Sequence, residues 1–287
     1  MFNASAHNTA AQLANGFFSF IPILPPNTII KNKQYDGKTP PPSVLWRKYQ
    51  KQLPAPSDWQ AYFKKYPNHN IAIITGKISN LTVLDIDLNG ASATALAPIL
   101  KDIPNKTPIA ITGAGGLHIY LPFLPIKTGV EYPINKVFPS LPADTPLKLD
   151  IRSEGGYVIA PPSTHKNGSQ YIWHPMHTPL TEYHKNELRF YNNELKQRLL
   201  TLIDRQKNTP QQKNWQKIIL SAHIGNRNNT ATQIAGLLLK YLPPSHWQSA
   251  AAPLLYAWNK TFAKPPLSNK ELETIINSIA KKQKRHY

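Results

Sequence analysis

Two aspartates stand two positions apart inside an apolar run of this 287-residue sequence, a spacing that could build a metal site. The run is LTVLDID (81–87), and the two acids are Asp85 and Asp87. On a β-strand, residues i and i+2 point to the same face, so the two carboxylates point together. Two like charges this close repel each other, and Mg²⁺ or Mn²⁺, which prefer carboxylate oxygens, would relieve the repulsion. The alternative is a pair of solvated acids at the turn signal DLNG that follows.

A third acid, Asp150, also stands between apolar neighbours, in the run LKLDIRS (147–153). Arg152 follows at i+2 and therefore shares its face of a strand. We expect Asp150 to complete a two-metal site and Arg152 to face a phosphate. A purely structural ion pair between Asp150 and Arg152 is the alternative.

A glycine-rich turn precedes another strand in the stretch TGAGGLHIYLP. Gly113, Gly115 and Gly116 allow close backbone approach, and their N–H groups could hold an anion. The same pattern is also common in ordinary hairpin turns. His118 begins the next strand. A single histidine is more often structural than catalytic, but beside a triphosphate site it would bind phosphate.

The elements that position these residues follow from the periodicity of the apolar side chains. Predicted strands are 70–76, 81–87, 107–113, 116–123, 147–153, 156–162 and 170–175. Predicted helices are 5–20, 57–66, 91–103 and 181–204, and the proline-rich segment 21–45 is expected to be irregular. This pattern of strands with few helices predicts an α+β fold.

The last third of the chain is predicted to be helical. The polar segment RQKNTPQQKN (205–214) is broken by Pro210 and is the best candidate for a linker. Four helical segments follow it, and Ser268 and Glu271 have the spacing of a capping box. We therefore predict a catalytic domain over 1–204 with its core at 65–180, a linker over 205–214, and a small all-α bundle over 215–287.

Composition limits the classes of partner and site. The formal net charge is +18, from 33 Lys and Arg against 15 Asp and Glu, which favours a polyanion such as nucleic acid over an anionic membrane surface. The absence of cysteine excludes structural disulfides, Cys-ligated zinc and iron–sulfur clusters. There is no apolar run of membrane-spanning length and no basic signal-peptide start. We expect a soluble cytoplasmic protein.

Several common active-site motifs are missing. The stretch DGKTP (36–40) looks like the end of a P-loop, but Asn32 stands where the first glycine is needed. Neither HExxH nor GxSxG occurs. Because the chain has no motor motif, we expect a separate helicase as its partner.

In their order along the chain, these motifs resemble those of the archaeo-eukaryotic primase superfamily, and most of all its bifunctional primase–polymerase domains from plasmids, phages and integrated elements. VLDID resembles the first motif, GGLHIY the second, and LDIR the third. The following run EGGYVIAPPSTHKNGSQYIW, with Ser163 and His165, also resembles the family. Many members have serine at the position of Gly116, so any hydroxyl contact with nucleotide there is absent.

The C-terminal region resembles the helical primase C-terminal domain that follows such catalytic domains. The resemblance lies in GNRNNTATQIAGLLLKYL, in AWN and in PPLSNKELETIINSIAKK. It implies that Asn226, Arg227 and Asn228 bind single-stranded template or the initiating nucleotide. Ordinary capping and turn roles for these three residues are an equal alternative.

The resemblance also implies the chemistry and the fold. Asp85, Asp87 and Asp150 would hold two Mg²⁺ or Mn²⁺ ions for nucleotidyl transfer from NTP or dNTP substrates on single-stranded DNA, within a catalytic domain that has an RRM-like half. Residues implied in nucleotide binding are His118, Arg152, Gly115, Gly116, Ser163 and His165. The whole protein would make primers de novo and extend them during replication of a plasmid, phage or similar element.

Two other functions are compatible with parts of this pattern. A two-metal nuclease or strand-transfer enzyme also clusters acids, but it has no need of the glycine turn and His118. A non-catalytic replication initiator would bind DNA through the helical domain and would carry a decayed catalytic unit, which the intact acids argue against.

Overall fold

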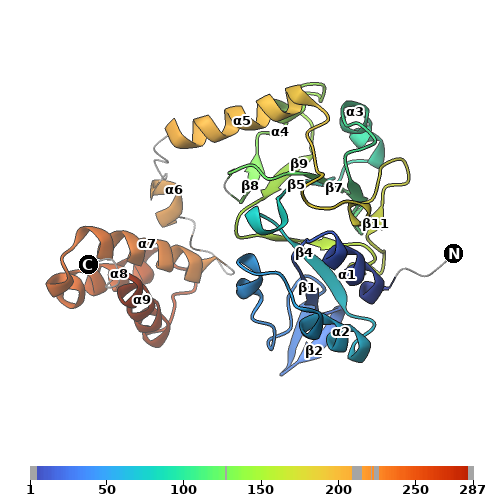
Figure 1. Cartoon of the computed structure of the whole chain (residues 1–287). Helices are drawn as coiled ribbons and strands as arrows, with labels where there is room; N and C mark the ends of the chain where they lie inside the picture. Colours follow the sequence, from blue (N-terminus) through green and yellow to red (C-terminus); the bar gives the residue numbers. More distant parts are fainter. Residues whose placement is uncertain (1–4, 127, 209–214, 221, 223–225, 284–287) are drawn as a thin grey trace. The chain divides into compact units, whose positions relative to one another are not determined.

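The computed structural model describes residues 5–126, 128–208, 215–220, 222 and 226–283 (Figure 1). The chain divides into two compact units, Met1–Asn208 and Thr209–Tyr287. The first mixes helices with strands and the second is helical, which confirms the predicted α+β class. None of the helices in the described ranges combines the length and the apolar character that a membrane crossing requires.

The elements of the first unit build three antiparallel sheets. In chain order they are α1 (Ala6–Asn15), β1 (Phe20–Ile23), β2 (Pro26–Ile30), β3 (Lys33–Asp36), η1 (Trp46–Gln50), α2 (Pro56–Lys65), β4 (Asn70–Ile74), β5 (Leu81–Asp87), α3 (Ala97–Asp102), β6 (Ile109–Ile111), β7 (Leu117–Pro122), β8 (Gly129–Tyr132), α4 (Ile134–Val137), β9 (Lys148–Arg152), β10 (Tyr157–Ala160), β11 (Ile172–Trp173) and α5 (Asn193–Asn208). The sheets have the strand orders β11-β6-β7-β5-β9-β8, β1-β4-β10 and β2-β3.

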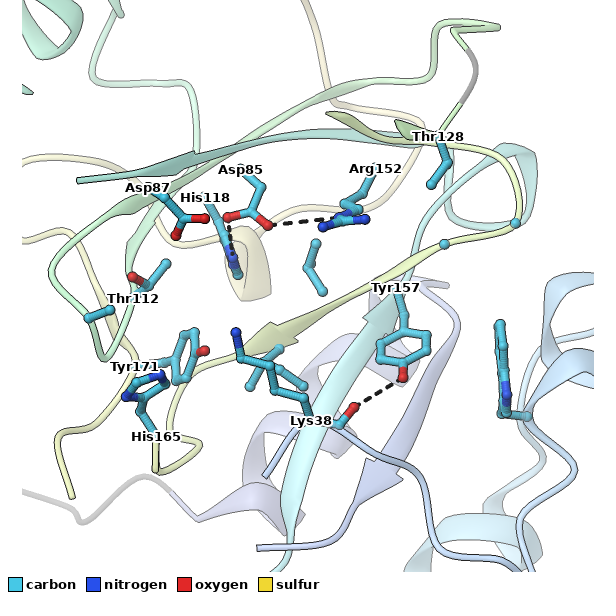
Figure 2. A pocket seen from close by; sticks show the side chains of 16 residues that line it. Lys38, Asp85, Asp87, Thr112, His118, Thr128, Arg152, Tyr157, His165 and Tyr171 are labelled. Carbon is cyan, nitrogen blue, oxygen red and sulfur yellow. Dashed lines mark hydrogen bonds and ion pairs between the residues drawn. The ribbon is translucent and has the colours of Figure 1, made fainter. Parts of the chain in front are cut away.

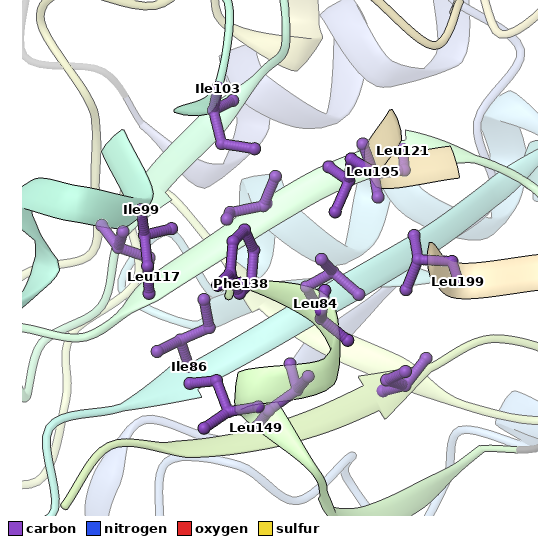
Figure 3. Packing of buried hydrophobic residues seen from close by; sticks show 14 of the residues in the cluster. Leu84, Ile86, Ile99, Ile103, Leu117, Leu121, Phe138, Leu149, Leu195 and Leu199 are labelled. Atoms are coloured by element: carbon purple, nitrogen blue, oxygen red, sulfur yellow. The ribbon is translucent and has the colours of Figure 1, made fainter. Parts of the chain in front are cut away.

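One face of the six-stranded sheet is apolar and buried. Strand β5 pairs with β7 on one side and β9 on the other, and α3, α4 and α5 cover the face that these strands share (Figure 3). Members of this cluster include Leu84, Ile86, Leu117, Leu149, Ile99, Val137 and Leu199. Because side chains alternate along a strand, a shift of one residue would push Asp85 and Asp87 into this core. The apolar face therefore fixes the direction in which both acids point.

The opposite face of the same sheet changes character along its length. At one end it packs against the β1-β4-β10 sheet and against α1 and α2 (Figure 1). This second cluster includes Leu81, Val83, Ala110, Tyr120, Ile73, Val158 and Trp59. Further along β5 the same face carries Asp85 and Asp87 instead, so the apolar contact between the sheets ends at the two acids.

The prediction that 21–45 is irregular is wrong in part. This segment contributes most of β1 and all of the β2–β3 hairpin. Strand β1 is buried because it pairs with β4, a long-range contact that local composition does not reveal. The helix predicted over 5–20 is also shorter than expected: it ends at Asn15, and Phe17 adopts a positive φ of 61°.

The predicted continuous helix over 181–204 is wrong in its first half, because α5 begins only at Asn193. Tertiary hydrogen bonds replace helical ones in the preceding segment. The Lys185 N–H donates to the Gly16 carbonyl at 2.9 Å, and its Nζ donates to the Ile78 carbonyl at 3.0 Å. The segment is thereby held against the body of the unit as a series of turns. Helix α5 then runs to Asn208, into the predicted linker 205–214, whose remaining residues lie outside the described chain.

The second unit contains the four predicted helices around one apolar cluster. They are α6 (Trp215–Leu220), α7 (Arg227–Tyr241), α8 (Ala252–Phe262) and α9 (Asn269–Gln283). Leu239, Leu255 and Leu272 are among the buried residues that join them. The predicted capping box is formed, since Glu271 Oε2 accepts the Ser268 N–H at 2.8 Å and Ser268 Oγ accepts the Glu271 N–H at 3.3 Å.

Candidate active site

The predicted site residues meet through the register of three strands. Asp85 on β5 lies directly opposite His118 on β7 and opposite Asp150 on β9. Asp87 and Arg152 lie on the same face, two positions from this pair in opposite directions, since Asp87 is opposite Lys148 and Arg152 is opposite Val83. The sheet therefore brings together three acids, a histidine and an arginine that are far apart in the sequence.

Asp85 is the most heavily contacted acid of the group. Its Oδ1 lies 3.3 Å from His118 Nε2, and its Oδ2 lies 3.8 Å from Arg152 Nε (Figure 2). Burial alone would raise its pKa, but the contact with His118 and the charges of Arg152 and Lys38 outweigh burial and lower it. Asp85 is therefore ionised and held in place.

Asp87 differs from its neighbour because it has no such partner. Among the described residues, its carboxylate makes no hydrogen bond and no ion pair. Partial enclosure by the surrounding walls raises its pKa, and the negative charge of Asp85 raises it further. The rise agrees in direction with the repulsion predicted from the sequence, although enclosure is the larger cause. A cation placed beside Asp87 would remove both penalties.

Asp150 forms the ion pair that was the structural alternative. Arg152 Nη2 donates to its Oδ2 at 2.8 Å, and the Glu131 N–H donates to its Oδ1 at 2.9 Å. Asp150 does not line the cavity beside Asp85 and Asp87. In the described part of the chain, no group of three or more His, Cys, Asp or Glu side chains is arranged to hold a metal ion.

Asp85 and Asp87 line a cavity of about 420 Å³ between the six-stranded sheet and the edge of β10 (Figure 2). Its walls combine residues from distant parts of the first unit. They are Lys38, Trp46, Asp85, Asp87, Thr112, Ala114, His118, Thr128, Arg152, Gly155, Gly156, Tyr157, Val158, Ile159, His165 and Tyr171. The cavity is therefore charged at the sheet and partly aromatic elsewhere.

His118 is almost completely buried, with 5% of its surface exposed. Its Nε2 faces Asp85, and its ring lies 5.9 Å from that of Tyr171. Its Nδ1 is buried and has no hydrogen-bond partner among the described residues. The position of the ring is thus set by strand register, by Asp85 and by aromatic packing.

The glycines of the turn at 113–116 allow β5 and β7 to pack closely, and they do not line the cavity. The Gly115 N–H donates to the Thr112 carbonyl at 2.8 Å, and the Gly116 N–H donates to Thr112 Oγ1 at 3.0 Å. A Cβ at Gly116 would lie 2.2 Å from the Ile86 carbonyl oxygen, so this position must be glycine for β7 to approach β5. Both N–H groups are used inside the turn, and Thr112 and Ala114 face the cavity instead.

The two predicted residues after β10 lie in different surroundings. Ser163 is 3% exposed, and its hydroxyl accepts the Ile71 N–H at 3.0 Å and donates to the Ile71 carbonyl at 3.1 Å. It ties the chain to β4 and does not line the cavity. His165 does line it, and it packs so closely on Gly113 that a Cβ there would be 2.1 Å from the His165 Cβ.

Asn226, Arg227 and Asn228 lie at the start of α7 in the second unit. The Asn226 carbonyl accepts the first helical hydrogen bond, from the Thr230 N–H at 3.0 Å, which is a capping role for its backbone. Arg227 Nη1 donates to the Pro265 carbonyl at 2.6 Å. Asn228 borders a shallow depression that it shares with Lys270.

The residues of the cavity wall that sequence reasoning missed include five polar or aromatic ones: Lys38, Trp46, Thr112, Tyr157 and Tyr171. Four of them had no usable signal, because single polar or aromatic residues in loops and strands are common. Lys38 stood in the stretch that was compared with a P-loop and rejected. Lys38 reaches the cavity because the β2–β3 hairpin ends beside the cavity.

Comparison with protein families agrees with this geometry. The family model described as bifunctional DNA primase/polymerase, N-terminal, matches residues 10–185. The model described as primase C terminal 1 matches residues 217–285. No curated protein matched the chain. The first match spans more than half of the sequence and contains all of the acids, the histidine and the arginine described above, and the chain therefore belongs to the bifunctional DNA primase/polymerase family, with a primase C-terminal domain in its second unit.

Proposed function

We propose that this protein makes DNA primers de novo on single-stranded template and extends them by two-metal nucleotidyl transfer. One observation carries the proposal: Asp85, His118 and Asp150 stand side by side on three neighbouring strands, and Asp87 lies at the cavity next to them with no partner among the described residues. A partly enclosed carboxylate with a raised pKa, placed beside other ionisable groups in a cavity, is typical of a functional site.

The acids suit a hard divalent cation by their chemistry, although no three of the described His, Cys, Asp or Glu side chains are arranged around one ion here. All of the acidic ligands are carboxylates, which suits Mg²⁺ or Mn²⁺, and the chain has no cysteine for a softer metal. Asp85 and Asp87 would hold the ions first. Asp150 keeps acceptor capacity beyond the two hydrogen bonds that it receives, because a carboxylate offers about four lone-pair positions. When bound, the ions would neutralise the triphosphate and activate the attacking 3′-hydroxyl.

The protein's own side chains then position the substrate. Arg152 is anchored by Asp85 and Asp150, so its guanidinium is held in a fixed place at the cavity wall, where it can meet a phosphate. The buried His118 holds Asp85 in place through its Nε2. Such fixed positioning is the main protein contribution to phosphoryl-type transfer.

Priming without a primer requires that two nucleotides be held at once. We assign the binding site for the second nucleotide, or for the template, to the start of α7, with Asn226, Arg227 and Asn228. The net charge of +18 supports binding to a DNA backbone. We place this activity in the replication of a plasmid, phage or similar element, with a separate helicase opening the duplex.

The test is a gel of products formed from labelled nucleotides on unprimed single-stranded DNA with Mg²⁺ or Mn²⁺. We expect template-dependent products that are lost in Asp85→Ala and in Asp150→Ala. DNA degradation that needs no nucleotide would support the nuclease instead. Normal replication of the element in a strain that carries Asp85→Ala would support a non-catalytic initiator.

A further inference from the structure

Lys38 projects into the cavity from outside the strands that carry the acids. It follows the β2–β3 hairpin, and its side chain lines the cavity with Asp85, Asp87 and Arg152 (Figure 2). No hydrogen bond or ion pair to its ammonium is found among the described residues. Its charge nevertheless reaches both acids, since it helps to lower the pKa of Asp85 and opposes the rise in the pKa of Asp87.

The backbone around Lys38 is anchored, although its side chain is not. The Lys38 N–H donates to Asp36 Oδ1 at 3.0 Å, and the Lys38 carbonyl accepts the Tyr157 hydroxyl at 3.0 Å. The preceding carbonyl, that of Gly37, accepts Asn70 Nδ2 at 3.2 Å. A lysine on a backbone held from three sides is delivered to one place, and its flexible stem lets the ammonium reach a ligand there.

Gly37 makes this arrangement possible. It has a φ of +84°, and a Cβ at this position would lie 3.1 Å from Pro26 Cδ. The chain can turn from β3 toward the cavity because glycine has access to this conformation at no steric cost. The hairpin and the glycine together aim Lys38 across the cavity at the acids.

The other cation of the described cavity wall is already engaged. Arg152 contacts both Asp85 and Asp150. Lys38 is the cation of the described wall that still has all its donors available, and an ammonium offers three. A ligand that brings several phosphate oxygens would satisfy them.

We infer that Lys38 is a substrate-binding residue that contacts the terminal phosphates of the incoming nucleoside triphosphate and selects triphosphates over monophosphates. This inference rests on the proposed function, since it concerns the same cavity and the same substrate. It adds a residue that follows the β2–β3 hairpin to a site whose acids, His118 and Arg152 come from β5, β7 and β9. A role limited to neutralising Asp85 and Asp87 would not distinguish the two classes of nucleotide.

The test is calorimetric titration of the full chain with a deoxynucleoside triphosphate and with the matching monophosphate, in Mg²⁺ and without template. For Lys38→Ala we expect triphosphate affinity to fall about tenfold and monophosphate affinity to stay unchanged. Lys38→Arg should keep most of the triphosphate affinity. The matched control is Lys33→Ala, because Lys33 is an exposed lysine on the same hairpin and does not line the cavity.

Three results would overturn the inference: unchanged triphosphate affinity in Lys38→Ala, an equal loss for monophosphate, or an equal loss in Lys33→Ala. Failure of the wild-type chain to bind triphosphate would overturn it as well. Because the titration involves no turnover, it separates the two proposals. Lys38-dependent triphosphate binding without any primer synthesis would contradict the proposed function and leave the role of Lys38 standing.

Discussion

Asp85 and Asp150 lie directly opposite each other on β5 and β9, and a single arginine contacts both. Arg152 Nε is 3.8 Å from Asp85 Oδ2, and its Nη2 is 2.8 Å from Asp150 Oδ2. The two acids would repel each other at this position, and the guanidinium between them offsets the repulsion. The same two contacts hold the guanidinium at the cavity wall, where a phosphate could reach it.

Replacement of Arg152 by lysine should therefore be far from conservative. An ammonium keeps the charge but cannot contact both acids and a phosphate in one plane. We expect nucleotide incorporation to fall by about 10²-fold, measured as the initial rate of primer extension. Arg198→Lys is the matched control, because Arg198 also bridges two acids, Asp102 and Glu194, away from the cavity. Equal losses in both variants would contradict the role of Arg152.

Asp87 should lower the free energy of unfolding of the metal-free protein at neutral pH. Its folded-state pKa is raised above the ordinary value of 3.8, so the folded state gains stability as Asp87 is protonated at falling pH and lacks that gain at neutral pH. We expect Asp87→Asn to raise the melting temperature in a chelator, by an amount that corresponds to less than about 1 kcal/mol for this solvent-accessible group. Mg²⁺ should stabilise the wild type more than the variant.

The control for Asp87 is Asp144→Asn, at an exposed acid outside the cavity. Its melting temperature should respond to Mg²⁺ as the wild type does. NMR titration of the metal-free protein gives a direct check, since the Asp87 carboxyl should titrate above 3.8 and that of Asp85 below it. Ordinary values for both acids would contradict the electrostatics described here.

Gly116→Ala should damage both fold and activity. The new Cβ would lie 2.2 Å from the Ile86 carbonyl oxygen, between Asp85 and Asp87 on β5, so β5 and β7 would have to move apart. We expect a loss of about 1–3 kcal/mol in the free energy of unfolding, measured by chemical denaturation, together with the loss of primer synthesis. Gly236→Ala in α7 is the opposite case: its Cβ meets open space, and it should stabilise the second unit by about 0.5–1 kcal/mol.

The buried His177 should make the first unit sensitive to acid. Burial lowers its pKa below 6.5, although hydrogen bonds with the backbone at Thr107 and Pro104 act in the other direction. A lowered histidine pKa gives stability that is present above 6.5 and is lost as pH falls through the lower folded-state value. We expect thermal stability to decline over this range below pH 6.5.

His177→Asn should reduce this acid sensitivity, since asparagine can keep the donor to the Thr107 carbonyl, which lies 3.0 Å from His177 Nδ1, and has no charge to gain. Thermal melts between pH 7.5 and pH 4.5 provide the measurement. The exposed His246 is the control, and His246→Asn should leave the pH profile of the wild type unchanged. A profile that is the same in all three proteins would show that His177 is not the responsible group.

Local spacing was enough to predict which acids share a face, the strands that carry them and the fold class. The i, i+2 position of Asp85 and Asp87 depends only on the geometry of a strand, and their apolar neighbours show which face is buried. The helical C-terminal region and its capping box at Ser268 followed from local periodicity in the same way. These features need no partner from elsewhere in the chain, so the sequence predicts them.

Contacts between distant segments decided the rest, because pairing energy and tertiary hydrogen bonds are not visible in a local window. Part of the proline-rich segment 21–45 forms strands because it pairs with other strands. The start of the predicted helix 181–204 is held in turns by the hydrogen bonds of Lys185, and the Ser163 hydroxyl bonds to β4. Lys38 reaches the acids only through the folded hairpin. The sequence alone thus predicted the acids that the sheet brings together, and the folded chain decided which cations lie beside them.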